Sequence, residues 1–302
     1  MSSDTLFDAL VVGGSVAGLS AALMLGRSRR RVLVLDAGSP ANRQTPHSHS
    51  FFTRDGATPQ QLLAIAREQL LPYTTVQLRT ATVTHITPDG PYFSLSTEDG
   101  QTFRGRKLLL ATGIRDEMPA LPGFADCWGI SVLHCPYCHG YEVHSQPLGV
   151  LGNGDMGFHF ARMIQHWSAD LRVFTNGPST FTAEQTQQLQ AHSVRIIETP
   201  LAALEHEAGQ LRYLRLTSDE QVPLTALFAH VPFSLPLDFH AQLGCELTEN
   251  GHLRTNEMGA TTVPGVFAAG DLTTPMRQIS VASAQGGMTG GALDRELIAA
   301  DF

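Results

Sequence analysis

The chain has 302 residues, 42% of them hydrophobic, and a formal net charge of −8. This length is enough for two domains with separate cores, and the negative charge argues against nucleic acid or anionic membranes as partners. No stretch reaches the roughly 18 apolar residues that cross a bilayer, and Met1–Thr5 lacks the features of a leader. Four cysteines, only two of them closely spaced, suggest catalysis in a reducing compartment. We therefore expect a cytoplasmic protein with no membrane partner.

The first predicted unit is a strand, a tight turn and a helix. An apolar run at residues 6–12 ends in Gly13-Gly14-Ser15-Val16-Ala17-Gly18, and an alanine-rich helical pattern follows. A second apolar strand, residues 31–35, ends in Asp36, whose carboxylate can accept hydrogen bonds from a ribose. This order is typical of a dinucleotide-binding βαβ unit, although Ser15 replaces the glycine that lets the backbone approach a pyrophosphate.

The loop at residues 40–56 contains two histidines, His47 and His49, beside aromatic residues. Such groups can approach a flavin or a substrate, but histidines in loops are more often solvated, so both interpretations stay open. Thr58 is predicted to cap the next helix, with Gln61 completing a capping box. That helix is expected to be scaffold.

Between residues 76 and 111 the hydrophobic pattern changes to a period of two. Strands are predicted at residues 82–86, 92–96 and 107–111, with Asp-Gly turns between them. This β-meander ends at Ala111-Thr112-Gly113, a turn of small residues that can lie close to a bound cofactor.

A Cys-x-x-Cys motif, Cys135-Pro136-Tyr137-Cys138, lies almost midway along the chain and is followed by His139. Two cysteines at this spacing can form a redox disulfide, and a helix that begins there would stabilise a thiolate. The imidazole can take a proton from one thiol and return it to a leaving sulfur. Half of a zinc site is the alternative, but Cys127 and Cys245 are single and apart, so we favour redox chemistry and expect no metal.

A second βαβ pattern begins at residues 147–151 with Gly152-Asn153-Gly154-Asp155-Met156-Gly157, a complete Gly-x-Gly-x-x-Gly. A helix and a strand at residues 171–174 follow. The next residues, 175–179, supply neither an acidic residue for a ribose nor an arginine pair for a 2′-phosphate. Pyridine-nucleotide binding and an unused nucleotide-type pocket therefore stay equally open.

Near the end of the chain, a strand at residues 266–269 leads into Gly270-Asp271. A long helix of small residues, 281–299, is predicted after Arg277-Gln278-Ile279. Its N-terminus can offset the negative charge of a reduced flavin.

In their order and spacing, these motifs together resemble the low-molecular-weight thioredoxin reductase family over essentially the whole chain. The motifs are the two glycine-rich turns, Ala111-Thr112-Gly113, the Cys-x-x-Cys pair, Gly270-Asp271 and Arg277-Gln278. The resemblance implies an α/β fold of two Rossmann-like domains, the second inserted into the first. Residues 1–116 and 234–302 would bind FAD, and residues 117–233 would form an NAD(P)H-type domain carrying the cysteines.

The same resemblance implies roles for individual residues. Cys138 would lie next to the flavin, Cys135 would attack an outside disulfide, and His139 would act as the acid–base group where the family usually has Asp. Asp271 would bind the ribityl chain, and Arg277 to Ile279 would lie along the isoalloxazine ring. The residues expected to bind FAD are Gly13, Gly14, Ser15, Ala17, Gly18, Asp36, Ala37, His49, Val83, Ala111, Thr112, Gly113, Gly270, Asp271, Arg277, Gln278 and Ile279.

The resemblance further implies a homodimer, and two departures point to a side branch of the family. The dithiol is followed by His-Gly-Tyr-Glu, and the basic motif for a 2′-phosphate is absent. In both features the chain resembles dithiol oxidases of the gliotoxin and holomycin type. It is also similar to thioredoxin-reductase-like flavoproteins that use no pyridine nucleotide. We expect an FAD-dependent disulfide oxidoreductase whose partner is a thioredoxin-like protein or a small-molecule disulfide or dithiol. Thioredoxin reduction is the leading function; oxidation of a small dithiol by oxygen, or reduction with a donor other than NADPH, is the alternative.

Overall fold

The computed structural model describes residues 5–302 and divides them into two compact units. The expectation that Met1–Asp4 contains no leader concerns residues outside this range. The first unit comprises the described residues up to Arg43, Ser50–Arg115 and Phe233–Phe302. The second comprises Gln44–His49 and Asp116–Pro232. Within residues 5–302, no helix combines the length and the apolar character that a bilayer crossing requires.

The unit boundaries differ from the expected ones at three places. The second unit begins at Asp116 and ends at Pro232, one residue from the expected limits at each end. The larger difference is the hexapeptide Gln44–His49, which was expected in the FAD domain but groups with the second unit. Its contacts explain this, because the Thr45 side chain packs against Gly129 and His49 forms an ion pair within the second unit.

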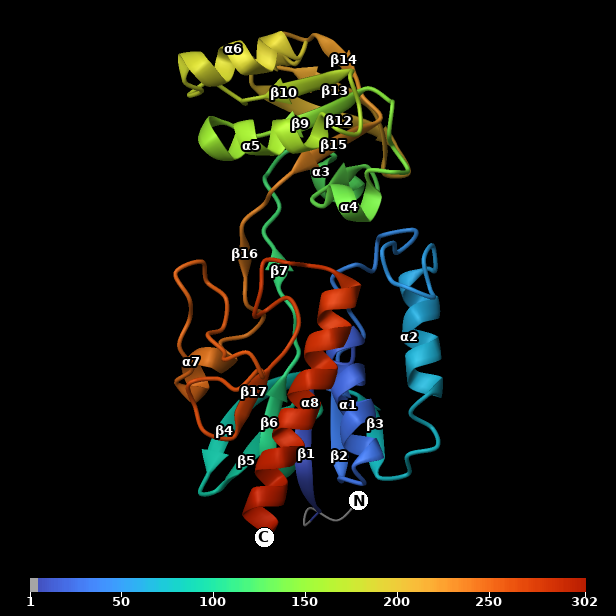
Figure 1. The fold of residues 1–302 in the computed structure, drawn as a ribbon, viewed down its shortest axis with the longest axis vertical. Helices are drawn as coiled ribbons and strands as arrows, with labels where there is room; N and C mark the ends of the chain where they lie inside the picture. The colour runs from blue at the N-terminus through green and yellow to red at the C-terminus, as the bar shows by residue number, and fades with distance from the viewer. Residues whose placement is uncertain (1–4) are drawn as a thin grey trace. The chain divides into compact units, whose positions relative to one another are not determined.

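The first unit is built on a seven-stranded sheet in the order β3-β2-β1-β6-β5-β4, with β17 also paired to β6 (Figure 1). One end of β6 pairs with β5 in antiparallel fashion and the other end pairs with β17 in parallel. The strands are β1 Leu6–Val12, β2 Val32–Asp36, β3 Val76–Thr80, β4 Val83–Asp89, β5 Tyr92–Thr97, β6 Thr102–Leu110 and β17 Val266–Ala268. The helices are α1 Val16–Arg27, α2 Pro59–Glu68, α7 Phe239–Leu243 and α8 Ile279–Asp301.

The continuous apolar run of β1 follows from burial on both faces of this sheet. Leu10 and Val12 belong to one core cluster, whereas Ala9 and Val11 belong to another. Successive side chains of a strand point to opposite faces, so both faces must be covered by other elements. On one of them α1 and α8 pack closely, because an added Cβ at Gly286 would meet the Ala17 carbonyl.

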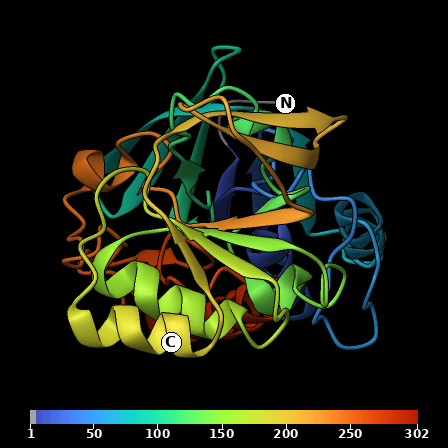
Figure 2. The same ribbon diagram turned by 90° about the horizontal axis from the view of Figure 1, so that it is seen from above.

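The second unit contains a five-stranded parallel sheet in the order β11-β10-β9-β15-β8 and a three-stranded antiparallel sheet of β12, β13 and β14. Helices α5 and α6 lie side by side in both ribbon views (Figures 1 and 2). The parallel strands are β8 Val132–Leu133, β9 Leu148–Leu151, β10 Leu171–Phe174, β11 Arg195–Ile197 and β15 Ala226–Ala229. The remaining elements are β12 Leu201–Glu207, β13 Gln210–Leu216, β14 Gln221–Pro223, α3 Phe124–Cys127, α4 Pro136–His139, α5 Gly154–Ile164 and α6 Ala183–Ala191.

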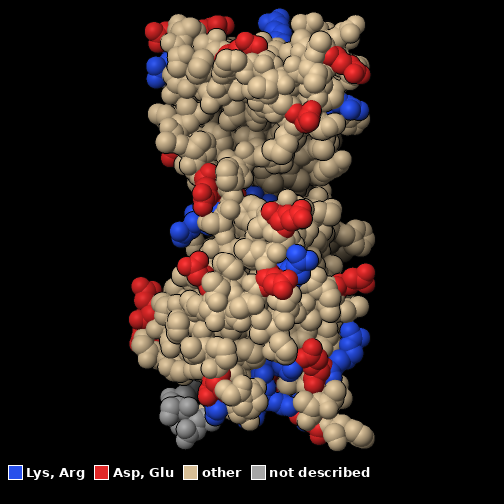
Figure 3. All heavy atoms as spheres, turned by 90° about the vertical axis from the view of Figure 1, so that its left-hand side faces the viewer, with Lys and Arg blue, Asp and Glu red and all other residues tan. Residues whose placement is uncertain are grey.

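The connecting segments β7 (Arg115–Asp116) and β16 (Phe233–Ser234) pair as a two-stranded sheet. The predicted α/β class with two Rossmann-like βαβ units is confirmed. The predicted capping box of Thr58 and Gln61 is present at the start of α2, and a second one, of Thr182 and Gln185, starts α6. On the face shown in Figure 3, acidic and basic side chains are scattered among uncharged ones, without a broad basic patch.

Candidate active site

The predicted redox pair is present as a disulfide between Cys135 and Cys138, whose Cα atoms are 5.3 Å apart. Cys135 is the N-cap of α4, and Pro136 occupies the first helical position, where its missing N–H costs nothing. The backbone N–H groups of Cys138 and His139 both donate to the Cys135 carbonyl oxygen at 3.3 Å. Within residues 5–302, no cluster of three His, Cys, Asp or Glu side chains is arranged to hold a metal ion.

The helix that follows Cys135 has only four residues. A helix dipole grows with the number of aligned peptide units, so α4 gives a thiolate much less support than a long helix would. Proton transfer at the dithiol therefore depends more on the neighbouring side chains than on the backbone.

His139 is the side chain best suited to that transfer, since it follows Cys138 directly. Burial lowers the pKa of its imidazole; the Glu142 carboxylate opposes this effect, and the nearby His49 adds to it. The net direction is downward, so His139 is uncharged at neutral pH and able to accept a proton from a thiol.

His49 lies in this cluster of the second unit, although the sequence suggested a place in the FAD site. Its Nε2 is 3.3 Å from Oε1 of Glu142. The ring of His49 stands edge-on to the ring of His139, with centroids 6.5 Å apart and planes at 89°. The ring of His47 is also near that of His49, at a centroid distance of 6.4 Å.

Glu142 was missed as a site residue by the sequence reasoning. A signal was available, because Glu142 is the last residue of the His-Gly-Tyr-Glu departure from the family pattern. What the sequence did not supply was its partner, which comes from a loop far upstream. The ion pair joins two segments that only the folded second unit brings together.

In the first unit, the glycine-rich turn after β1 forms a cradle for a dinucleotide. Gly13 has φ +107 and donates its N–H to the Leu35 carbonyl oxygen at 2.8 Å. Ser15, the N-cap of α1, makes no side-chain capping hydrogen bond, so no side chain caps the amides of the first turn of this 12-residue helix. Such amides are suited to the pyrophosphate of FAD.

The other expected FAD residues of this region converge on the same turn. An added Cβ at Gly13 would lie 2.2 Å from the Ala111 carbonyl oxygen, and one at Gly14 would lie 2.6 Å from Cβ of Asp36. The Gly270 N–H donates to Oε1 of Gln285 at 2.9 Å, a contact that the sequence did not suggest. The carboxyl ends of β1, β2, β6 and β17 thus meet where a dinucleotide binds in this class of sheet.

Some expected residues have a less specific place. The Val83 side chain is 3% exposed and belongs to a core cluster, and Ala37 is exposed beside Asp36. Gln278 is the N-cap of α8 and Ile279 its first residue. The described geometry gives these four side chains no distinct role in binding.

The second glycine-rich turn differs from the first because its own side chains occupy it. The Asn153 Oδ1 atom accepts hydrogen bonds from the N–H of Gly154 at 2.9 Å, and from the N–H and hydroxyl of Thr180 at 2.8 and 3.1 Å. The Asn153 amide nitrogen donates to the Pro178 carbonyl oxygen at 2.9 Å. Asp155 adds a carboxylate in the first turn of α5. The residues at this turn therefore fit a pyridine dinucleotide poorly.

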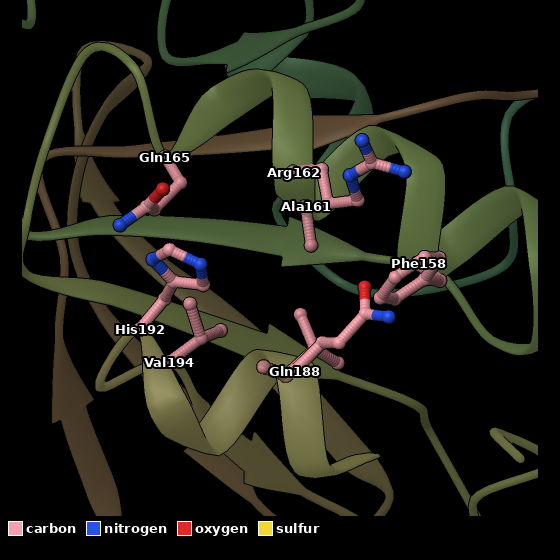
Figure 4. Close-up of a pocket in the computed structure, with 8 residues that line it drawn as sticks. Phe158, Ala161, Arg162, Gln165, Gln188, His192 and Val194 are labelled. Carbon is pink, nitrogen blue, oxygen red and sulfur yellow. The ribbon is translucent and has the colours of Figure 1, made fainter. Parts of the chain in front are cut away.

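A shallow groove elsewhere in the second unit lies between α5 and α6 (Figure 4). Arg162, Gln188 and His192 line it, and the Arg162 guanidinium lies 5.5 Å from the centroid of the Phe158 ring. Neither cysteine of the disulfide lines this groove, so we do not include it in the candidate site.

Comparison with known proteins gives a match over nearly the whole chain. Residues 7–286 match the family model described as pyridine nucleotide-disulphide oxidoreductase. Thioredoxin reductase aclD of Aspergillus oryzae is 32% identical over 295 residues, with 94% of each chain covered. Thioredoxin reductase sirT of Leptosphaeria maculans is 32% identical, with 99% of this chain and 96% of sirT covered. An oxidoreductase structure from Agrobacterium tumefaciens has a TM-score of 0.91 and 35% identity, covering 97% of this chain and 99% of its own.

Proposed function

Since the chain belongs to the pyridine nucleotide-disulphide oxidoreductase family and is an FAD-dependent disulfide oxidoreductase of the thioredoxin reductase type, we propose that it oxidises an outside dithiol. In this proposal the electrons come from the thiol side and not from a pyridine nucleotide. The final acceptor is molecular oxygen. The substrate class is a small molecule with two neighbouring thiols.

The hydrogen bonds of Asn153 are the observation that favours electron flow from a thiol over electron flow from a pyridine nucleotide. A bound dinucleotide needs the free amides at the start of the helix and the space between that turn and the end of the next strand. In the second unit, Asn153 accepts from the Gly154 amide and ties residues 178–180 across the turn. Asp155 would repel a pyrophosphate, and residues 175–179 contain no basic side chain. In the first unit, no side chain caps the corresponding turn.

Each cysteine has one role in the proposed reaction. A thiol of the substrate gives its proton to His139, and its sulfur bonds to Sγ of Cys135. The Cys135–Cys138 bond breaks, its electron pair moves to Sγ of Cys138, and His139 returns the proton to that sulfur. The second substrate thiol then displaces Cys135 from the mixed disulfide and leaves its proton there, so a cyclic disulfide departs.

The enzyme dithiol then holds the two electrons and two protons of the substrate. Bound FAD would supply the acceptor for these electrons and the route to oxygen, which would be reduced to hydrogen peroxide. Gly13, Gly14, Ser15 and Asp36 would hold its dinucleotide part in the first unit, and Cys138 would be the sulfur that reacts with it.

An anaerobic titration followed by flavin absorbance tests this proposal. A small dithiol should bleach the flavin, whereas NADPH and NADH should not, and reduced ferredoxin serves as a third donor. In air, the dithiol should sustain oxygen uptake. Rapid bleaching by NADPH together with no response to dithiols would overturn the proposal.

Thioredoxin reduction is the second candidate, and the similarity to the thioredoxin reductases aclD and sirT favours it. It requires a donor that reduces the flavin and an outside protein disulfide that accepts electrons at Cys135. Multiple turnover of thioredoxin with any of the three donors would support this candidate over dithiol oxidation.

We expect Cys138→Ser to retain FAD and to lose turnover entirely. The serine hydroxyl cannot form the disulfide that passes electrons to the flavin, while the cradle in the first unit is unchanged. Cofactor content and oxygen uptake measure the two effects. Cys127→Ser, a buried cysteine outside the disulfide, is the matched control and should retain turnover. Normal activity of Cys138→Ser would contradict the role assigned to this sulfur.

We further propose that the protein is a homodimer and acts in the reducing cytoplasm. The family resemblance supports the dimer, and the presence of only one disulfide among four cysteines supports the compartment. Light scattering of the purified protein tests the first proposal, and fractionation of cells tests the second.

A further inference from the structure

The second unit places two imidazoles and one carboxylate beside the redox disulfide. His139 comes from α4, Glu142 from the turn after it, and His49 from the hexapeptide Gln44–His49. These groups are close to one another, with 3.3 Å between His49 Nε2 and Glu142 Oε1 and 6.5 Å between the two ring centroids. The mechanism above uses only His139.

The exposure of these groups sets how strongly they interact. The His49 side chain is 19% exposed and the Glu142 side chain 40% exposed. Charges that are partly removed from water interact more strongly than those on a fully solvated surface. Two imidazolium ions this close would repel each other, so one proton on the pair is favoured over two.

We infer that His49 and Glu142 are positioning residues for His139: they share one proton with it and control when His139 accepts a proton from a substrate thiol. This inference rests on the proposed dithiol chemistry. It assigns a role in that chemistry to a loop residue of the N-terminal part of the chain.

The proton balance defines what each group does. Before reaction, His139 is neutral, and the Glu142 carboxylate lies 3.3 Å from His49 Nε2 in the same cluster. His139 takes the thiol proton while the S–S bond breaks, and the nearby carboxylate stabilises the imidazolium for that interval. Return of the proton to Sγ of Cys138 restores the starting state, so the cluster gains and loses no proton in a full cycle.

The pH behaviour of His139 depends on the groups that face it. Glu142 and His49 both interact with it, and His47 adjoins His49. Tyr137 and Tyr141 flank it on its own segment and are mostly exposed. Of these, Glu142 and His49 are the groups whose charges act on His139.

The test is the titration of His139 in the full-length oxidised protein, followed by NMR of labelled histidines and assigned with His139→Gln. Glu142→Gln should lower the apparent pKa of His139, because the stabilising carboxylate is lost. His49→Gln should raise it, because the competing imidazole is lost. His144→Gln, which removes an exposed histidine of the same segment, is the matched control and should leave the titration unchanged.

A second readout is independent of flavin and oxygen. The rate at which dithiothreitol reduces the Cys135–Cys138 disulfide, measured by quenching and mass spectrometry, should fall about threefold or more at neutral pH in Glu142→Gln. Glu142→Asp should recover part of the rate, and circular dichroism shows whether each variant is folded.

The two proposals fail in different ways. If no dithiol supports oxygen uptake, the proposed function is wrong, yet the titration and the dithiothreitol rate still report on the cluster. If folded Glu142→Gln and His49→Gln leave the His139 titration where it is in the wild type, the positioning role is wrong even when dithiol oxidation proceeds.

Discussion

Asn153 gives the second glycine-rich turn a chemistry that the first turn lacks. Its side-chain oxygen accepts from Gly154 and Thr180, and its nitrogen donates to Pro178. The equivalent position in the first turn is Gly14, which has no side chain that could form such hydrogen bonds. The Asn153 side chain thus occupies hydrogen-bonding groups in the second turn, whereas no side chain does so at the equivalent position of the first turn.

We expect Asn153→Ala to destabilise the protein and to open the second turn. The variant loses the N-cap of α5 and the tether to residues 178–180, a cost of about 1–2 kcal/mol in the free energy of unfolding. Urea denaturation measures this cost, and anaerobic stopped-flow absorbance measures flavin reduction by NADPH, which should become faster than in the wild type. Thr217→Ala, in a turn elsewhere in the second unit, serves as a control. A variant as stable as the wild type would show that the tether contributes little.

Individual site residues differed in how far the sequence could predict them. Cys135, Cys138 and His139 lie within one short motif, so their proximity follows from chain connectivity alone. His49 could not be assigned to them, because its contact with Glu142 depends on the path of a loop with no periodic pattern. The effect of Asn153 was also hidden, since the Gly-x-Gly-x-x-Gly pattern leaves that position unspecified.

At the scale of elements, α8 shows how packing and charge combine. Its glycines allow close approach to α1, since a Cβ at Gly290 would lie 2.8 Å from the Ala21 carbonyl oxygen. At its end, Asp301 is unfavourably placed for the helix dipole, which disfavours negative charge there. Arg30 and Arg106 offset this by pairing with Asp301 at 2.6 and 2.5 Å.

These ion pairs predict a contribution to stability that depends on pH. Hydrogen bonds from Arg106 and Arg30 lower the pKa of Asp301 in the folded state. A lowered folded-state pKa stabilises the protein above the unfolded-state pKa, and this stabilisation is lost as the pH falls through the lowered value. Asp301→Asn should therefore be less stable than the wild type at pH of about 7 and should approach it below pH of about 4.

Urea denaturation of both proteins across this pH range measures the difference. Asp219→Asn removes a carboxylate that is 91% exposed, in the other unit, and should show a smaller difference at neutral pH. A constant difference between Asp301→Asn and the wild type at all pH values would rule out the electrostatic origin.

Element prediction succeeded where local chemistry was unambiguous. The capping box predicted at Thr58 marks the start of α2, because the cap and its reciprocal glutamine lie three residues apart. Strand β12 was missed because two register shifts, after Leu201 and after Glu205, interrupt its alternation of buried and exposed residues. A helix was expected to begin at the dithiol, and α4 does begin there, ending at His139.

At the scale of the whole molecule, each unit has its own hydrophobic cores. The second unit contains one cluster around Phe124, Phe174 and Leu214 and another around Phe158 and Phe228. Nearly all of it comes from one continuous stretch, Asp116–Pro232. The two βαβ patterns were visible in the sequence, whereas the insertion of one domain into the other was implied by the family resemblance.

We predict that a fragment of residues 116–232 folds without the rest of the chain. Its parallel sheet and both cores are complete within the fragment, as expected of an independent domain. Thermal unfolding followed by circular dichroism should give a cooperative transition. Leu214→Ala, at a fully buried position, should lower its stability by about 2–5 kcal/mol. Absence of a cooperative transition would show that this unit needs the other part of the chain.

The hexapeptide Gln44–His49 has a consequence for recombination among relatives. A chimera that exchanges residues 116–232 alone would combine a donor's dithiol segment with the recipient's His49 or whatever residue stands there. The two residues of the His49–Glu142 pair would then come from two different proteins. A transplant that keeps its proton chemistry must carry two separate pieces of gene, one of them only six codons long.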